Sequence, residues 1–374
     1  MKMKGGFLSA DWAKEHPGRG IFVLIVTFIM AFIITSSFDI EMYTGFFGYL
    51  AMSCVGMLVV LGAMWKGRSL PVDNIPQPLS GMLMGIFAFI WGTLLCYGLI
   101  NFVGGGALHP FVALHTIMSI VTMFFIFLAF NFWPFNKLSP PAAGFTYIIT
   151  AYTIAFCLIQ LFDFSLVSYP LGVYPSPIDP VPLYVAGGPL EIFFAPTGPF
   201  PWEHGITYTL CSLVFLWVFA ILGMWPFSNF KLEQPVFGAA VTASCLILGY
   251  IAFNVGVYQL HIEPLHLMSY AIGAIFGMLI TLTIFQTWPG RTMKGLAGGF
   301  FNLALSLVMG AVGYIIVQAF CMWHFGETMV YPDGLNAINT MMLGLLFPIW
   351  AAYGDLFEFW PLPPLAPSDE EPVE

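Results

Sequence analysis

Ten apolar runs, each long enough to cross a lipid bilayer, dominate this chain of 374 residues. A hydrocarbon core of about 30 Å needs roughly 20 apolar residues in a helix. Because backbone groups cannot stay unpaired in lipid, each run is predicted to be a transmembrane α-helix. The composition agrees, since 59% of the residues are hydrophobic and only 8% are charged. The runs cover approximately residues 20–38, 45–65, 79–102, 111–133, 142–165, 205–225, 236–257, 265–288, 297–321 and 336–357.

All ten lysines and arginines precede the first run or lie in every second gap after it. Positive residues in short loops favour the cytoplasmic side of a membrane. We therefore predict an all-α integral membrane protein with about ten transmembrane helices and both termini cytoplasmic, in the plasma (inner) membrane. The basic residues are Lys2, Lys4, Lys14, Arg19, Lys66, Arg68, Lys137, Lys231, Arg291 and Lys294.

The chain is predicted to form a single polytopic membrane domain over residues 1–366, followed by an acidic cytoplasmic tail over 367–374. The net charge of -9 comes from this tail and from the outer gaps, so it predicts no nucleic-acid partner. A long extracytoplasmic loop over about 164–203 is rich in proline, glycine and aromatic residues. Loops of this length are usually functional. We expect an ordered lid or re-entrant segment over the outer mouth, with a partner-docking surface as the alternative.

The even-numbered runs share a recurring end. A tryptophan comes first, and in most cases a proline, a short basic linker and a glycine-bearing helix start follow it. Repetition of this order predicts five pseudo-repeated helical hairpins, an arrangement typical of transporters and channels. The alternative is that tryptophan and proline simply mark the membrane interfaces. The tryptophans are Trp65, Trp133, Trp225, Trp288 and Trp360.

One of these linkers reads Leu222-Gly223-Met224-Trp225-Pro226-Phe227. A hairpin of two helices joined in this way resembles those of the urea/amide channel family. The resemblance covers one hairpin at a time, and this chain has five where that family has three. It implies a small uncharged or amine solute.

The gaps on the outer side hold no positive charge, but they contain nine carboxylates and six of the seven histidines. Such a surface attracts cations. Several of these residues precede the tryptophan-ended helices, so the fold could gather them around one axis. We predict a substrate or ion vestibule there. Its candidate residues are Glu203, His204, His261, Glu263, His266, Asp163, His109 and His115.

Four of these residues could hold a divalent metal, the one cofactor that the sequence suggests. Imidazole and carboxylate groups suit Zn, Cu, Ni or Fe. The spacing matches no strong motif, since HExxH is absent, and a proton-sensitive outer gate is an equal alternative. The possible ligands are His204, His261, His266 and Glu263.

Polar side chains inside the runs, such as Asn254, Asn302 and Asn339, are further candidates. Together with tyrosine, tryptophan and phenylalanine they would suit a small polar solute or an organic ammonium ion held by cation–π contacts. No lysine or arginine lies in the middle of a run, which argues against an anion pathway.

These features favour a transporter or channel for a small polar or cationic solute, and a transport protein more than an enzyme. The second hypothesis is a membrane subunit of a multiprotein enzyme or electron-transfer complex, whose outer face binds a metal or docks a partner. The expected partners are the lipid bilayer and a small solute, with a homo-oligomer or further membrane-complex subunits as alternatives. No Walker A, GxGxxG or CxxCH motif is present.

Overall fold

The computed structural model describes residues 11–65, 71–104, 110–164, 197–331 and 333–363. Within them lie ten helices that are long and apolar enough to cross a membrane, which confirms an integral multi-pass membrane protein. Each matches one predicted run, and we number them spans 1 to 10. They cover Gly18–Thr35, Met42–Met64, Leu79–Val103, Pro110–Ala129, Pro140–Ile159, Trp202–Ile221, Val236–Gln259, Pro264–Ile284, Leu296–Thr328 and Asp333–Leu356.

Odd- and even-numbered spans differ in burial. In the even-numbered spans, 61–72% of the residues in an 18-residue window are buried inside the protein, against 22–39% in the odd-numbered spans. A helix that is buried on most sides packs against several neighbours, whereas the others leave most of their surface to the surroundings. The even-numbered spans therefore form the core of the bundle, and the odd-numbered spans lie outside it.

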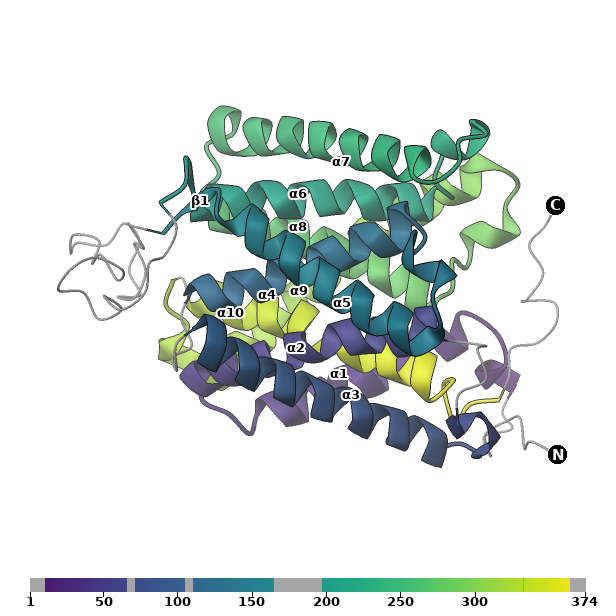
Figure 1. The fold of residues 1–374 in the computed structure, drawn as a ribbon. Coiled ribbons are helices and arrows are strands. Elements are labelled where there is room, and N and C mark those ends of the chain that lie inside the picture. The colour runs from purple at the N-terminus through teal and green to yellow at the C-terminus, as the bar shows by residue number, and fades with distance from the viewer. Residues whose placement is uncertain (1–10, 66–70, 105–109, 165–196, 332, 364–374) are drawn as a thin grey trace.

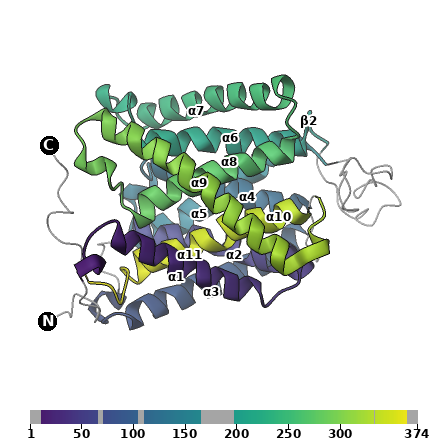
Figure 2. The same cartoon turned by 180° about the vertical axis from the view of Figure 1, so that it is seen from behind.

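Contacts between the even-numbered spans run from span 2 round to span 10 and back to span 2, so these spans close into a ring. Figures 1 and 2 show the helices of the bundle from two opposite sides. The main helices of the even-numbered spans contact one another in the order α2, α4, α6, α8 and α10, and the π-helical segment Thr340–Leu346, which continues α10, returns to α2. The short helix α11 (Phe347–Ala351) completes span 10. The ring helices are α2 (Gly48–Val59), α4 (Pro110–Phe124), α6 (Trp202–Ile221), α8 (Pro264–Leu279) and α10 (Asp333–Asn339).

Each outer helix packs along one ring helix. α3 lies on α2, α5 on α4, α7 on α6 and α9 on α8, while α1 lies on span 10. The first and last spans therefore pack on each other as consecutive ring and outer spans do elsewhere in the bundle. Trp350 Nε1 donates a buried hydrogen bond of 2.9 Å to Thr27 Oγ1 between them. The outer helices are α1 (Gly18–Thr35), α3 (Leu79–Gly98), α5 (Pro140–Ile159), α7 (Val236–Asn254) and α9 (Leu296–Phe325).

A glycine near the start of each outer helix rests against the end of a second ring span. A Cβ atom at Gly20 would meet the ring of Phe285, and one at Gly238 would meet the ring of Phe130. α1 thus begins against span 8 and α7 against span 4, although their bodies pack on spans 10 and 6. Each outer helix bridges two adjacent ring helices. The other pairs are Gly81 with Phe357, Gly144 with Trp65, and Gly299 with Leu222.

Four ring spans end in corners with the same backbone course. Two residues with positive φ precede a tryptophan that is joined to proline by a cis peptide bond. Span 2 ends on Trp65 without a following proline, and its indole Nε1 donates to the carbonyl of Pro140 at the start of α5. Proline cannot continue the helix, so each corner turns the chain towards the outer layer. The pairs are Trp133–Pro134, Trp225–Pro226, Trp288–Pro289 and Trp360–Pro361.

The two ends of the bundle differ in their basic residues, since the described lysines and arginines lie at one end only, together with acidic residues such as Glu15, Glu233 and Asp355. At the basic end, where odd-numbered spans begin, Arg19 Nη1 donates to the carbonyl of Pro363, and its guanidinium lies 5.0 Å from the ring centre of Phe359. This end has the described residues Lys14, Arg19, Lys137, Lys231, Arg291 and Lys294. The opposite, acidic end has Asp39, Glu41, Asp163, Glu203, Glu263, Glu327 and Asp333.

The connection between α5 and α6, at the acidic end, departs from a purely helical fold. The strands β1 (Phe162–Asp163) and β2 (Phe200–Pro201) pair in parallel beside the start of α6. Residues 165–196, which hold most of the predicted lid, lie outside the described residues, as do His109 and the acidic tail. α9 also runs past the predicted end of its run at residue 321 to Phe325, so that His324 belongs to its last turn.

Candidate functional site

A cavity of about 410 Å³ lies inside the ring, and all five ring spans line it. It begins at the acidic end, among the first residues of the ring helices, with Pro110, Trp202 and Asp333 in its wall. Its lining extends along the ring helices as far as Phe124, Leu279 and Phe347. The volume corresponds to on the order of a dozen water molecules. We call this space the central cavity.

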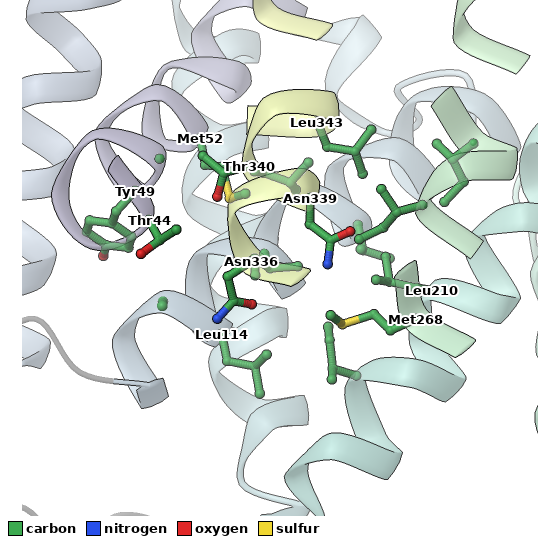
Figure 3. A pocket seen from close by; sticks show the side chains of 18 of the residues that line it. Thr44, Tyr49, Met52, Leu114, Leu210, Met268, Asn336, Asn339, Thr340 and Leu343 are labelled. Carbon is green, nitrogen blue, oxygen red and sulfur yellow. The ribbon is translucent and has the colours of Figure 1, made fainter. Parts of the chain in front are cut away.

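Spans 2 and 10 supply the polar wall of the central cavity. Figure 3 shows Thr44 and Tyr49 on span 2, and Asn336, Asn339 and Thr340 on span 10, around the same space. The two spans approach closely because Gly48 has no side chain, and a Cβ atom there would lie 2.6 Å from Thr340 Cγ2.

The other three ring spans give the cavity an apolar wall. α4, α6 and α8 contribute only apolar or aromatic side chains to the lining, including Leu114, Leu210 and Met268 (Figure 3). A cavity with one polar wall and three apolar walls fits a small molecule that is polar at one edge and hydrocarbon elsewhere. The other lining residues of these spans are Pro110, Ala113, Ile117, Ile120, Val121, Phe124, Trp202, Ile206, Leu213, Leu265, Ile272, Ile275 and Leu279.

Two residues of the polar wall, Asn339 and Tyr49, each have a buried polar atom without a hydrogen-bond partner within the described part of the chain. Asn339 Nδ2 donates to Ser269 Oγ at 3.0 Å, and Ser269 Oγ donates in turn to the carbonyl of Leu265 at 3.1 Å. Asn339 Oδ1 is buried and has no hydrogen-bond partner within the described part of the chain. An unpaired buried acceptor costs about 1–3 kcal/mol. A ligand that brings a donor to this wall would remove that cost.

The polar wall follows from the local structure of spans 2 and 10. Both contain long π-helical segments at the cavity, Met42–Phe47 and Thr340–Leu346. A π-helical turn interrupts the regular rotation of side chains and is frequent at functional sites. Asn336, Asn339 and Thr340 nevertheless keep a spacing of three and four residues, which places them on one face of the helix.

Aromatic side chains close the central cavity at the end that faces the basic end of the bundle. The ring centres of Phe124 and Phe347 are 5.8 Å apart, and Trp217 contacts Phe124 edge-on at 5.1 Å. Beyond them, the fully buried Trp350 lies 4.8 Å from the ring of Phe276. Trp217 Nε1 is a further buried group without a partner among the described residues. The cavity therefore occupies the half of the ring nearer the acidic end.

None of the seven described residues among the predicted site residues lines the central cavity. Glu263 and His266 lie together at the acidic end, where Glu263 Oε2 accepts from the backbone N–H of His266 at 3.0 Å and lies 2.9 Å from His266 Nδ1. Glu263 caps α8 in this way, and His266 stacks on Tyr331 with ring centres 5.3 Å apart.

The histidines of α4 and α6 face away from the axis. His115 Nε2 lies 2.9 Å from the carbonyl oxygen of Tyr152, so it joins α4 to the outer helix α5. His204 contacts the rings of Phe253 and Tyr258 in span 7. Both side chains are therefore directed towards outer spans.

The remaining predicted residues are spread over the acidic end. Asp163 lies in β1, Glu203 in the first turn of α6, and the exposed His261 adopts a φ of 52° just before α8. Over the described ranges, no group of three or more His, Cys, Asp or Glu side chains is arranged to hold a metal ion.

Sequence reasoning missed most of the polar wall. A polar residue inside an apolar run identifies Asn339 as a candidate, but it does not identify Asn336, Thr340, Thr44 or Tyr49. The spacing of Asn336, Asn339 and Thr340 is the feature of the sequence that indicates a shared polar face on one helix. The other candidates have different surroundings, since Asn302 Nδ2 donates to the carbonyl of Thr287 and Asn302 Oδ1 accepts from Gly290 N.

No protein-family model, curated protein or solved structure matches this chain. The resemblance to urea/amide channels therefore remains limited to the sequence of single hairpins.

Proposed function

We propose that the protein transports a small amphipathic cation, an alkylammonium or alkylguanidinium ion, through the ring of even-numbered spans. The observation that carries this proposal is the central cavity, with its polar wall on spans 2 and 10 and its apolar wall on α4, α6 and α8. The cationic head would donate hydrogen bonds to Asn339 Oδ1 and its neighbours. The hydrocarbon part would contact the opposite wall.

The charge of the acidic end supports a cation. Asp333 lies in the cavity lining, and Glu41 is close enough to interact with it electrostatically, so two carboxyl groups lie near this opening. The sequence has no lysine or arginine in any gap that faces this end. An opening whose charged groups all have one sign raises the local concentration of ions of the opposite sign. In the same proposal, Glu263 and His266 belong to the outer vestibule that recruits the solute.

The aromatic contacts of Phe124, Trp217 and Phe347 support a gated pathway. They fill the axis directly below the cavity, so a solute that reaches the floor must displace at least one ring to proceed. In this proposal the described conformation is open towards the acidic end and closed towards the basic end. Transport then requires a second conformation in which these rings separate.

We further propose that the ten spans are five related hairpins, each made of one ring span and the outer helix that packs along it. The recurrent corners and the five equivalent glycine contacts support this arrangement. Span 10 and α1 would form the fifth hairpin across the two ends of the chain. The basic end, with both termini, would be cytoplasmic in the plasma (inner) membrane, because positive residues favour that side.

Uptake into proteoliposomes tests the proposed function. Butylguanidinium, butylurea and butylsulfonate share one hydrocarbon chain but carry charges of plus one, zero and minus one. We expect saturable uptake of butylguanidinium, slower uptake of butylurea and no uptake of butylsulfonate above protein-free vesicles. Equal rates for all three solutes would contradict selection by charge. If no solute enters faster than into protein-free vesicles, the transport proposal is wrong.

A further inference from the structure

A second cavity, of about 660 Å³, lies outside the ring, between α5 and α7. The outward faces of α4 and α6 form its floor, and the outer helices form its sides. Leu158 of α5 is 40% exposed, and Leu246 and Tyr250 of α7 are 41% and 59% exposed. Because these helices face the bilayer, the cavity opens sideways to lipid. We call it the lateral groove.

A continuous strip of aromatic rings follows the lateral groove along α6 and span 7. His204, Phe253 and Tyr258 contact one another edge-to-face, with ring centres 5.7–6.2 Å apart. Tyr208 continues the strip to Phe253 and to Tyr250. Such a surface favours a flat ring or an unsaturated chain, because aromatic groups prefer stacked or edge-on contacts.

Two hydrogen-bonding groups that remain available in the groove lie at its acidic end. Neither ring nitrogen of His204 makes a hydrogen bond within the described part of the chain, and Tyr258 is 57% exposed. Deeper in the groove, Thr122 donates to the carbonyl of Met118 and Ser212 to that of Tyr208, whereas the buried Thr242 Oγ1 has no hydrogen-bond partner within the described part of the chain. The groove is therefore polar at its acidic end, and the Thr242 hydroxyl is the one buried, unpaired side-chain oxygen that we identify among the described residues along its otherwise mainly apolar length.

The charge of the groove indicates an uncharged ligand. No Asp, Glu, Lys or Arg lines it, and no lysine or arginine occurs in any gap at the acidic end. A phospholipid would bring a phosphate group to this end without a cationic partner. An uncharged head group with hydrogen-bonding oxygens meets no such penalty.

We infer that the lateral groove binds a quinone-type lipid, with a flat ring that carries carbonyl or hydroxyl groups and an isoprenoid tail. The ring lies against the aromatic strip and accepts a hydrogen bond from His204, while Tyr258 supplies the second polar contact. The tail extends between Leu158 and Leu246 towards the basic end. This site is separate from the central cavity, and it does not depend on the proposed transport.

Retention of decylubiquinone by the immobilised protein in detergent, quantified by chromatography, tests this site. We expect saturable, equimolar binding. Leu246→Trp fills the groove and should weaken binding at least about tenfold. Its control, Ile247→Trp, changes the next residue, which is 61% exposed and does not line the groove, so binding should stay unchanged. His204→Phe keeps a ring but removes the donor, and should weaken binding about fivefold.

Three outcomes would overturn the inference. One is non-saturable retention, and another is equal loss in Leu246→Trp and Ile247→Trp. The third is displacement of decylubiquinone by an equal amount of phosphatidylglycerol or of a sterol, which would assign the groove to a different lipid. Size-exclusion chromatography of both variants separates loss of the site from loss of the fold, because Leu246→Trp must elute as the parent and Ile247→Trp do.

Discussion

The two faces of α6 differ in a way that the hydropathy of the helix does not reveal. Towards the axis it presents Ile206, Leu210 and Leu213 to the central cavity. Towards the outer helices it presents His204 and Tyr208 to the lateral groove. Polar side chains of a membrane helix are thus not directed to the axis by default. The polar wall of the central cavity comes instead from spans 2 and 10, which meet on the far side of the ring.

The largest effect should come from breaking the support that outer helices give to the ring. α8 and α9 cross at Gly277, where a Cβ atom would lie 1.9 Å from the carbonyl oxygen of Ser306. Gly277→Ala should destabilise the protein by about 3 kcal/mol, because backbone rather than a flexible side chain must move. Thermal unfolding in detergent measures this loss.

The matched control is Gly85→Ala in α3. Nothing lies within 4 Å of a Cβ atom at Gly85, although it belongs to a similar small-xxx-small pair with Gly81. We expect its unfolding temperature to stay within about 2 °C of the parent. An equal loss in both variants would mean that close packing of α8 on α9 does not hold the ring.

A bulky side chain in the central cavity tests whether the two sites on the opposite faces of α6 act independently. Leu210→Trp places a large side chain in the cavity and should lower butylguanidinium uptake more than about tenfold, while decylubiquinone binding stays at the parent level. Leu246→Trp should do the opposite. If either variant impairs both readouts in a folded protein, the two sites are not independent.

Removing the unpaired acceptor tests the polar wall with a smaller change. Asn339→Leu should lower butylguanidinium uptake about fivefold, mainly through a higher KM, because the solute loses one hydrogen bond. Ser269→Ala is the control, since it removes the partner of Asn339 Nδ2 without changing a residue that lines the cavity. An uptake loss as large in Ser269→Ala would show that Asn339 acts through packing.

Removing the charge of Asp333, at the acidic opening of the central cavity, should have the smallest effect on uptake. Asp333→Asn is expected to slow butylguanidinium uptake about two- to threefold at low ionic strength, and the difference should disappear near 1 M salt, where the Debye length is about 3 Å. Butylurea uptake should not change. A salt-independent loss would indicate that Asp333 contacts the solute directly instead of attracting it from solution.

The sequence predicted the ten spans well because the length and polarity of a membrane helix are fixed by the bilayer. It also located the corners, since Trp133–Pro134 and its equivalents combine a helix stop with an interfacial side chain. The candidate site was predicted less well. The chemistry of imidazole makes His115 and His204 candidates. Whether a side chain faces the axis or an outer helix depends on the rotation of its helix, however, and hydropathy leaves that rotation open when all faces of the helix are apolar.

By itself, the sequence determined that this chain crosses a membrane ten times and that its basic residues share one end, because both properties depend on the local transfer energies of consecutive residues. Only the tertiary structure decided that the even-numbered spans form the ring, that α1 packs outside it against span 10, and that Asn339 faces a cavity while His204 faces the lateral groove. These properties depend on which helices approach closely, as at Gly48 and Gly277, and such contacts join residues that are distant in the chain.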